Sequence, residues 1–150
     1  MTADKFHERR AKFWGGGFLY DPDTSRVLLH LRDGNTPHNP HQWAFFGGSS
    51  EGDESFGECF VREMKEEIGL VIPPERAIYL RDYLRTDESL HRAVFYAESN
   101  VPIERLTLGE GAGFRWFAWD ELPHYDLTAH TRKDLDYFHA FIESHKSSSH

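Results

Sequence analysis

The sequence predicts a single α/β domain, and three observations support this fold class. The chain has 150 residues, a length that suits one domain. Strand-like runs separated by turn residues alternate with amphipathic helical patterns. No internal repeat, linker or low-complexity segment divides the chain. We therefore expect one domain that spans residues 1–150.

Five segments have the composition and spacing of β-strands. Asp21-Pro22-Asp23 separates the first two of them, and residues 33–42 are too rich in Pro, Asn and Gly to be anything but a loop. The glycines of the first run lie inside a strand pattern with no helix after them, so they indicate a bulge or a close backbone approach and not a dinucleotide site. The expected strands are 12–20, 26–32, 78–85, 91–98 and 114–118.

Two helices are expected, one near the middle of the chain and one at its end. The first covers residues 55–68, with Ser55 as N-cap, Glu58 three residues later to complete a capping box, and Gly69 at its end. The second covers residues 131–144, where apolar residues at helical spacing predict a face that packs on the sheet.

Charge and cysteine content narrow the functional classes. With 17 basic and 25 acidic residues the formal net charge is −8, so the chain lacks the basic excess that nonspecific nucleic-acid or membrane binding requires. A phosphate substrate stays compatible, because a divalent cation can bridge carboxylates and phosphate oxygens. Cys59 is the single cysteine, which excludes an intramolecular disulfide and a cysteine-rich zinc site.

The chain shows no targeting or membrane-spanning pattern. Its start has no apolar core of signal-peptide length, and no run of 18 apolar residues occurs anywhere. We therefore expect a soluble, cytoplasmic protein without a membrane partner, and a homodimer stays open as its assembly.

The first helix concentrates acidic residues on one face. If Glu63 is placed at zero on a helical wheel, Glu67 falls at about 40° and Glu66 at about −60°. Like charges four residues apart cost about 0.2 to 0.5 kcal/mol, so local stability does not favour this arrangement. Hard cations such as Mg²⁺ or Mn²⁺ select clustered carboxylates and offset the repulsion. A solvated acidic face is the alternative for this helix taken alone.

The spacing around that helix favours the metal-binding alternative. Gly48 is followed after five residues by Glu54 and after seven more by the run REMKEEIGL, Arg62 to Leu70. This matches the Nudix box, Gly-x5-Glu-x7-Arg-Glu-U-x-Glu-Glu-x-Gly-U with U a bulky aliphatic residue, at every fixed or restricted position. The sequence therefore resembles a Nudix hydrolase over residues 48–70. The resemblance implies an α/β/α sandwich around a mixed β-sheet.

The resemblance also implies roles for individual residues. In the family, the glycine at the position of Gly47 offers its backbone carbonyl to a metal ion, usually Mg²⁺ with Mn²⁺ as a substitute. The acids that match Glu63, Glu66 and Glu67 ligate metal or orient water. The residues that match Gly48, Glu54 and Arg62 support the loop and helix. Phe46 replaces a frequent proline, which weakens inference about the substrate side of the loop.

A further acid is expected in the loop that precedes the fifth strand-like run, residues 114–118. Many family members have an acid in the loop before an aromatic strand, and Glu110 is the best match here, as a metal ligand or general base. Glu121 is a weaker match. We favour Glu63 over Glu110 as the general base, with Glu66 as a further catalytic acid, although spacing alone does not separate them.

The implied activity is metal-dependent hydrolysis of a nucleoside diphosphate linked to another group, with release of a nucleoside monophosphate. Candidate substrates are nucleoside triphosphates, nucleotide sugars, ADP-ribose and dinucleoside polyphosphates. A nucleotide-sensing module without catalysis is the alternative, and an allylic diphosphate isomerase is disfavoured because it would need a well-placed cysteine. Loop 33–42 is the expected rim of the substrate site. Several residues could stack on a base or pair with a phosphate: Phe18, Trp43, Phe45, Arg81, Tyr83, Arg85 and Arg92.

Overall fold

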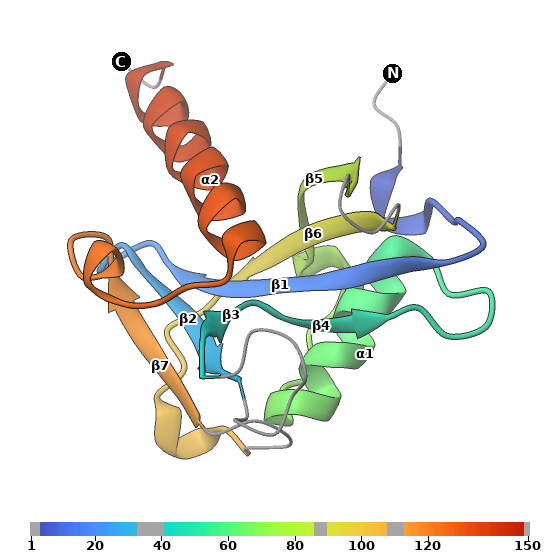
Figure 1. Ribbon diagram of the computed structural model, residues 1–150, viewed down its shortest axis with the longest axis horizontal. Helices are drawn as coiled ribbons and strands as arrows, with labels where there is room; N and C mark the ends of the chain where they lie inside the picture. Colours follow the sequence, from blue (N-terminus) through green and yellow to red (C-terminus); the bar gives the residue numbers. More distant parts are fainter. Residues whose placement is uncertain (1–3, 33–40, 86–89, 108–112, 149–150) are drawn as a thin grey trace.

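The structure, a computed structural model, describes residues 4–32, 41–85, 90–107 and 113–148. Figure 1 shows a twisted sheet with the two α-helices on opposite sides of it. The strands are β1 (Phe13–Asp21), β2 (Arg26–Leu31), β3 (Trp43–Ala44), β4 (Phe46–Ser49), β5 (Ile78–Leu84), β6 (His91–Glu98) and β7 (Gly113–Ala118). The helices are α1 (Phe56–Ile68) and α2 (Ala129–Ser148), with short 3-10 turns η1 (Lys5–His7), η2 (Pro74–Arg76), η3 (Ile103–Arg105) and η4 (Leu122–His124).

The described strands form one mixed seven-stranded sheet in which β1 is central. The main order is β3-β2-β1-β6-β5, with β7 also paired to β2 and β4 also paired to β1. The β1–β6 pair is parallel, while the other named pairs are antiparallel. A parallel pair requires a long crossover, and the chain between these two strands includes α1. The predicted α/β sandwich around a mixed sheet is confirmed.

The glycines of β1 let other backbone segments approach closely. A Cβ atom on Gly17 would lie 1.6 Å from the carbonyl oxygen of Phe95 on β6, and one on Gly15 would lie 2.7 Å from the Cys59 sulfur on α1. Neither position can hold a side chain without displacing its neighbour. The expectation of a close backbone approach is therefore confirmed.

Each face of the sheet has its own apolar core, because side chains alternate along a strand. On the α1 side, Phe13 and Leu19 of β1 pack with Phe60 and Met64 of the helix. On the α2 side, Phe18 of β1 packs with other fully or largely buried residues, among them Phe45, Phe117, Leu135 and Phe138. The two cores fix α1 and α2 on the two sides of the sheet.

The five predicted strands and the two predicted helices are all present, with small differences at their ends. The two short strands β3 and β4 were not expected, and α2 is longer at both ends than residues 131–144. Phe18 and Phe45 are 0% and 3% exposed, so they are core residues and are not available for base stacking. None of the helices in the described parts of the chain is long and apolar enough to cross a membrane.

Candidate active site

The helix α1 begins and ends as its sequence predicts. The Ser55 hydroxyl accepts a hydrogen bond from the Glu58 backbone, and the Glu58 carboxylate accepts one from the Ser55 backbone. At the other end Gly69 adopts a left-handed conformation, with φ 69° and ψ 16°, and its N–H bonds to the Lys65 carbonyl. These caps satisfy orphan backbone groups at both ends of the helix. The acids between them therefore project from a well-defined helix.

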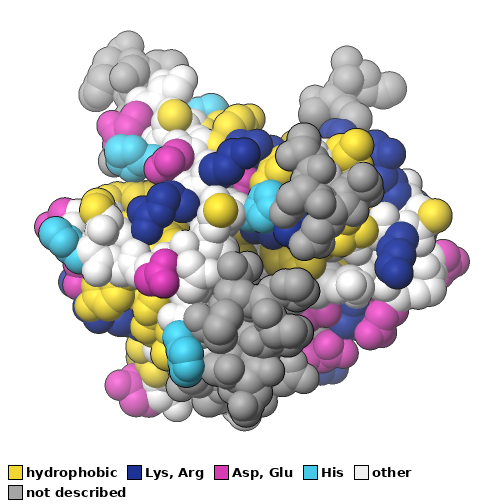
Figure 2. All heavy atoms as spheres, viewed as in Figure 1, with side chains coloured by type: hydrophobic (Ala, Val, Ile, Leu, Met, Phe, Trp, Pro, Cys, Tyr) yellow, Lys and Arg dark blue, Asp and Glu magenta, His cyan; other side chains and the backbone are white. Residues whose placement is uncertain are grey.

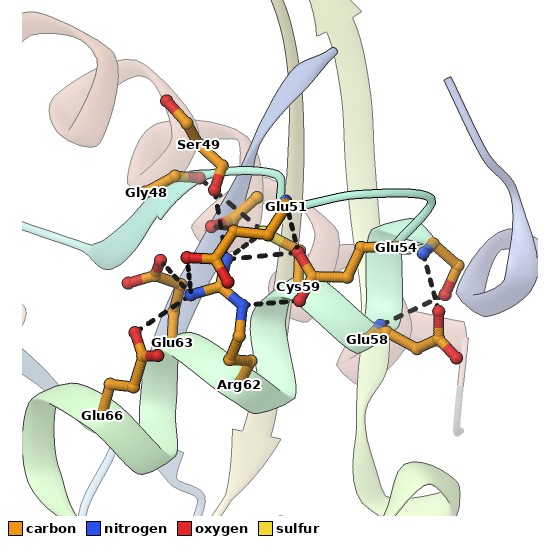
Figure 3. A network of polar contacts seen from close by, with 11 residues as sticks. Gly48, Ser49, Glu51, Glu54, Glu58, Cys59, Arg62, Glu63 and Glu66 are labelled. Atoms are coloured by element: carbon orange, nitrogen blue, oxygen red, sulfur yellow. Dashed lines mark hydrogen bonds and ion pairs between the residues drawn. The ribbon is translucent and has the colours of Figure 1, made fainter. Parts of the chain in front are cut away.

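Arg62 is the centre of the polar network in Figure 3. Its Nε donates to Glu54 Oε2 at 2.5 Å and its Nη2 to Glu54 Oε1 at 3.2 Å, which is a bidentate pair. Nη2 also donates to the Ser49 carbonyl at 3.1 Å, which ties α1 to the end of β4. The hydrogen bonds to Glu54 raise the pKa of Arg62 above its ordinary value, so the guanidinium stays charged.

The same guanidinium gathers two of the predicted catalytic acids. Arg62 Nη1 donates to Glu63 Oε2 at 3.0 Å and to Glu66 Oε2 at 3.0 Å, and it lies 3.4 Å from Glu51 Oε2. Figure 3 shows these carboxylates turned toward one point beside the helix. The side chains of Glu51 and Glu66 are exposed by 68% and 56%. In Figure 2 acidic side chains gather at the lower right, on the side of α1.

Glu63 differs from the other acids because it is buried. It is 8% exposed, so the alternative of a solvated acidic face does not hold for Glu63. Burial raises the pKa of this carboxyl, and the nearby Glu66 charge raises it further, while Arg62 and a hydrogen bond with Glu67 oppose the change. Glu63 thus interacts with both other acids of the helix face, with Glu66 through charge repulsion and with Glu67 through a hydrogen bond.

The glycine pair of β4 makes room for the buried acid. A Cβ atom on Gly48 would lie 2.6 Å from Glu63 Oε2, so only glycine allows the carboxylate to take this position. Gly47 is the next residue toward β3, on the strand segment that pairs with β1. The box glycines therefore bring the backbone of β4 against the acidic face of α1.

The donor set suits a hard divalent cation. Glu63 and Glu66 already converge on one positively charged nitrogen, that of Arg62, and carboxylate oxygens are the ligands that Mg²⁺ prefers. Among the described residues, no group of three or more His, Cys, Asp or Glu side chains is already arranged to hold a metal.

Several other predicted residues are accounted for differently. Glu110 and most of loop 33–42 lie outside the described residues. Glu121 accepts hydrogen bonds from Arg115 Nη2 and from the Ala118 backbone, both at 2.8 Å, so it closes the turn after β7.

Arg92 is 4% exposed and paired with Asp134 at 2.8 Å, which makes it an interior residue and not a free phosphate partner. No local pattern in the sequence predicts this pair, because the two residues are 42 positions apart.

Cys59 of α1 is buried beside the site. It is fully buried, its sulfur is 3.7 Å from the carbonyl oxygens of Gly15 and Gly48, and burial raises the pKa of its thiol. A protonated, buried thiol is a poor nucleophile. The residue fills the space beneath the glycines of β1 and β4.

Comparison with known proteins gives one consistent family. The model of the NUDIX domain matches residues 16–139. A prenyl-diphosphate phosphatase from Methanosarcina mazei is 28% identical over 107 residues, which cover 69% of this chain and 62% of that protein. The nucleoside triphosphatase NudI from Escherichia coli is 30% identical over 108 residues, which cover 64% of this chain and 75% of that protein.

A solved structure agrees with these relatives. The crystal structure of a MutT NUDIX hydrolase from Burkholderia pseudomallei superimposes with a TM-score of 0.67 at 25% sequence identity. The superposition covers 84% of this chain and 96% of that one.

Proposed function

Because this chain belongs to the Nudix family of diphosphohydrolases, we propose that it hydrolyses the diphosphate linkage of a nucleoside diphosphate derivative with the help of Mg²⁺ or Mn²⁺. The observation that carries the proposal is that Glu63 and Glu66 both accept a hydrogen bond from Arg62 Nη1, beside the glycine pair of β4. We further propose that residues 1–150 act as one domain.

The ligand set of the proposal follows the complete box. Glu63, Glu66, Glu67 and the Gly47 carbonyl would hold the metal, with Glu110 as a further ligand, while Glu54, Arg62 and Gly48 keep the loop and helix in register. When bound, the metal neutralises diphosphate oxygens and acidifies a water molecule. A metal would then share the carboxylates that now face Arg62.

Glu63 is the proposed general base. Burial raises the pKa of this carboxyl above its ordinary value, so its ionised form is a stronger base than an exposed carboxylate. Glu63 takes the proton of the attacking water, the new P–O bond forms, and the bridging P–O bond of the diphosphate breaks. The products are a nucleoside monophosphate and a phosphorylated remainder, or pyrophosphate when the substrate is a nucleoside triphosphate.

A substrate panel with product identification tests this function. It contains nucleoside triphosphates, nucleotide sugars, ADP-ribose and dinucleoside polyphosphates, together with a prenyl diphosphate because one relative is a prenyl-diphosphate phosphatase. We expect Mg²⁺-dependent release of a nucleoside monophosphate from at least one compound. No turnover of any compound would favour the alternative of a nucleotide-sensing module, and turnover of the prenyl diphosphate alone would contradict the nucleotide substrate.

A pair of exposed acids gives a matched control for the site. Glu66 and Glu51 are both exposed and both face Arg62 Nη1, but only Glu66 belongs to the proposed ligand set. Glu66→Gln is expected to lower kcat/KM by about 10²-fold or more, the range for lost metal-ligand or acid–base groups. Glu51→Gln is expected to stay within a few-fold of the parent. Equal losses in the two variants would contradict the proposed ligand set.

A further inference from the structure

Trp14 of β1 lies against the glycine pair from the side opposite to α1. A Cβ atom on Gly47 would lie 2.3 Å from Cζ2 of the Trp14 ring, and one on Gly16 would lie 2.8 Å from Cη2. Gly16 and Gly47 are register partners in the β1–β4 pair. The indole therefore covers the backbone of both strands at the point where Gly47 is proposed to face the metal.

The indole is held on its ring face by a buried ion pair. The guanidinium carbon of Arg92 on β6 lies 4.0 Å from the Trp14 ring centroid, a cation–π contact. Arg92 Nε donates to Asp134 Oδ2 of α2 at 2.8 Å, and the Tyr83 hydroxyl donates to Asp134 Oδ1 at 2.9 Å. Arg92 is 4% exposed and Asp134 is 0% exposed. These contacts form a column from α2 through β6 and β1 to β4.

The chemistry of the column is suited to positioning the indole ring. A buried ion pair offsets its desolvation cost only in good geometry, and apolar residues of similar size often give an equally stable core. A planar guanidinium that is anchored by a carboxylate can set the height of an aromatic ring in a way that an aliphatic chain cannot. Gly48, the neighbour of Gly47, is meanwhile in contact with Glu63 on the α1 side. The pair is thus confined from both faces of the sheet, by Trp14 on one side and by Glu63 on the other.

We propose that Trp14, held by Arg92 and Asp134, is a positioning residue that fixes the Gly47 carbonyl for metal binding. The inference rests on the proposed function, since it assumes that Gly47 is a metal ligand. It makes α2, which has no residue in the proposed ligand set, a part of the metal site through three side chains. Outer partners of metal ligands commonly change metal affinity about 10- to 100-fold when they are replaced.

The test is a titration with Mn²⁺ in the absence of substrate. Electron paramagnetic resonance measures the free ion, and the affinity follows from the amount bound. Trp14→Leu removes the ring, and Trp119→Leu is its control, because Trp119 is also half-buried but packs on Phe138 and His139 of α2. We expect Trp14→Leu to bind Mn²⁺ about tenfold more weakly than Trp119→Leu, with urea unfolding followed for both. Trp14→Phe keeps an aromatic face and is expected to restore most of the affinity.

Arg92→Lys keeps the positive charge beside Asp134 but lacks the plane that stacks on the indole, and it serves if Trp14→Leu does not fold. We expect it to weaken Mn²⁺ binding while the unfolding transition changes little. Unchanged Mn²⁺ affinity in Trp14→Leu, or in Arg92→Lys, overturns the positioning role alone. A parent protein that binds no Mn²⁺ overturns the metal site of the proposed function and this inference together.

Discussion

Two arginine clusters, one on each face of the sheet, differ in net charge and in exposure to solvent. On the α1 face, Arg62 meets four carboxylates within 3.4 Å, and two of them are largely exposed. On the α2 face, two guanidiniums, those of Arg81 and Arg92, share the single carboxylate of Asp134, which is fully buried. The first cluster keeps an excess of negative charge at the surface, whereas the second keeps one net positive charge among aromatic rings.

Exposure to solvent distinguishes the two clusters as candidates for binding a cation. An exposed acidic excess is open to a cation and costs little to rearrange, because solvent screens its charges. The buried cluster has its partners in place: Arg81 stacks on the Tyr83 and Tyr137 rings and Arg92 on Trp14. On the proposed function, a metal ion would share the carboxylates of the α1 cluster with Arg62, whereas the contacts of the α2 cluster would not need to change.

The largest expected effect comes from breaking the buried cluster. Asp134→Leu leaves the Arg92 guanidinium buried without its carboxylate, and such a loss costs about 3 to 5 kcal/mol of unfolding free energy. Urea unfolding followed by circular dichroism measures it. The double variant Arg92→Met/Asp134→Leu is the control and is expected to recover most of the loss, since both charges are gone. A single variant as stable as the parent would show that the buried pair is not needed.

The exposed cluster is expected to be weaker and to respond to metal. Arg62→Ala removes the bidentate partner of Glu54 and leaves four acids without their counter-charge, which we expect to cost about 1.5 to 3 kcal/mol. Excess MgCl2 should restore part of this stability, because a cation replaces the guanidinium, whereas NaCl at equal ionic strength should restore less. Asp134→Leu should gain nothing specific from MgCl2. Equal recovery of the two variants in MgCl2 would erase the distinction between the clusters.

The α1 cluster could be predicted from the sequence because its residues lie close together along the chain. Residues 48–70 are continuous, so helical spacing places Glu63, Glu66 and Glu67 on one face, and the capping residues mark where the helix begins and ends. The same spacing does not reveal that Glu63 is buried, because its burial depends on the lack of a side chain at Gly48 on another strand.

The α2 cluster was beyond sequence reasoning for a different physical reason. Arg92, Asp134 and Trp14 meet only when β6, α2 and β1 are packed, and no periodic pattern links residues so far apart. From the sequence, Arg92 is one of three arginines that could pair with a phosphate, and its buried ion pair with Asp134 reverses that expectation. The strands β3 and β4 escaped prediction because their two and four residues are too few to show a period.

The pH dependence of stability tests the Arg62–Glu54 pair of the α1 cluster. Partial burial raises the pKa of Glu54, but hydrogen bonds from Arg62 and the Glu51 backbone outweigh it and hold the pKa below its ordinary value of 4.5. The ionised Glu54 therefore stabilises the fold above that value, and this contribution is lost as the pH falls through the lowered pKa. Glu54→Gln should cost about 1 to 2 kcal/mol at pH 7, and the difference from the parent should shrink on acidification. Urea titrations from neutral to acidic pH measure the gap, and a constant gap would contradict the assignment.

The smallest effect is expected at a third arginine, which shows how far exposure decides the outcome. Arg115 Nη2 pairs with Glu121 Oε2 at 2.8 Å, as close as Arg92 pairs with Asp134, but the two side chains are 40% and 37% exposed. Water solvates both charges in the unfolded and the folded state, so an exposed pair contributes little. Glu121→Gln, which keeps an oxygen for the Ala118 backbone N–H, should leave the urea midpoint unchanged within error. If it lowered the midpoint as much as Asp134→Leu does, pairing distance and not burial would govern the strength of these arginine clusters.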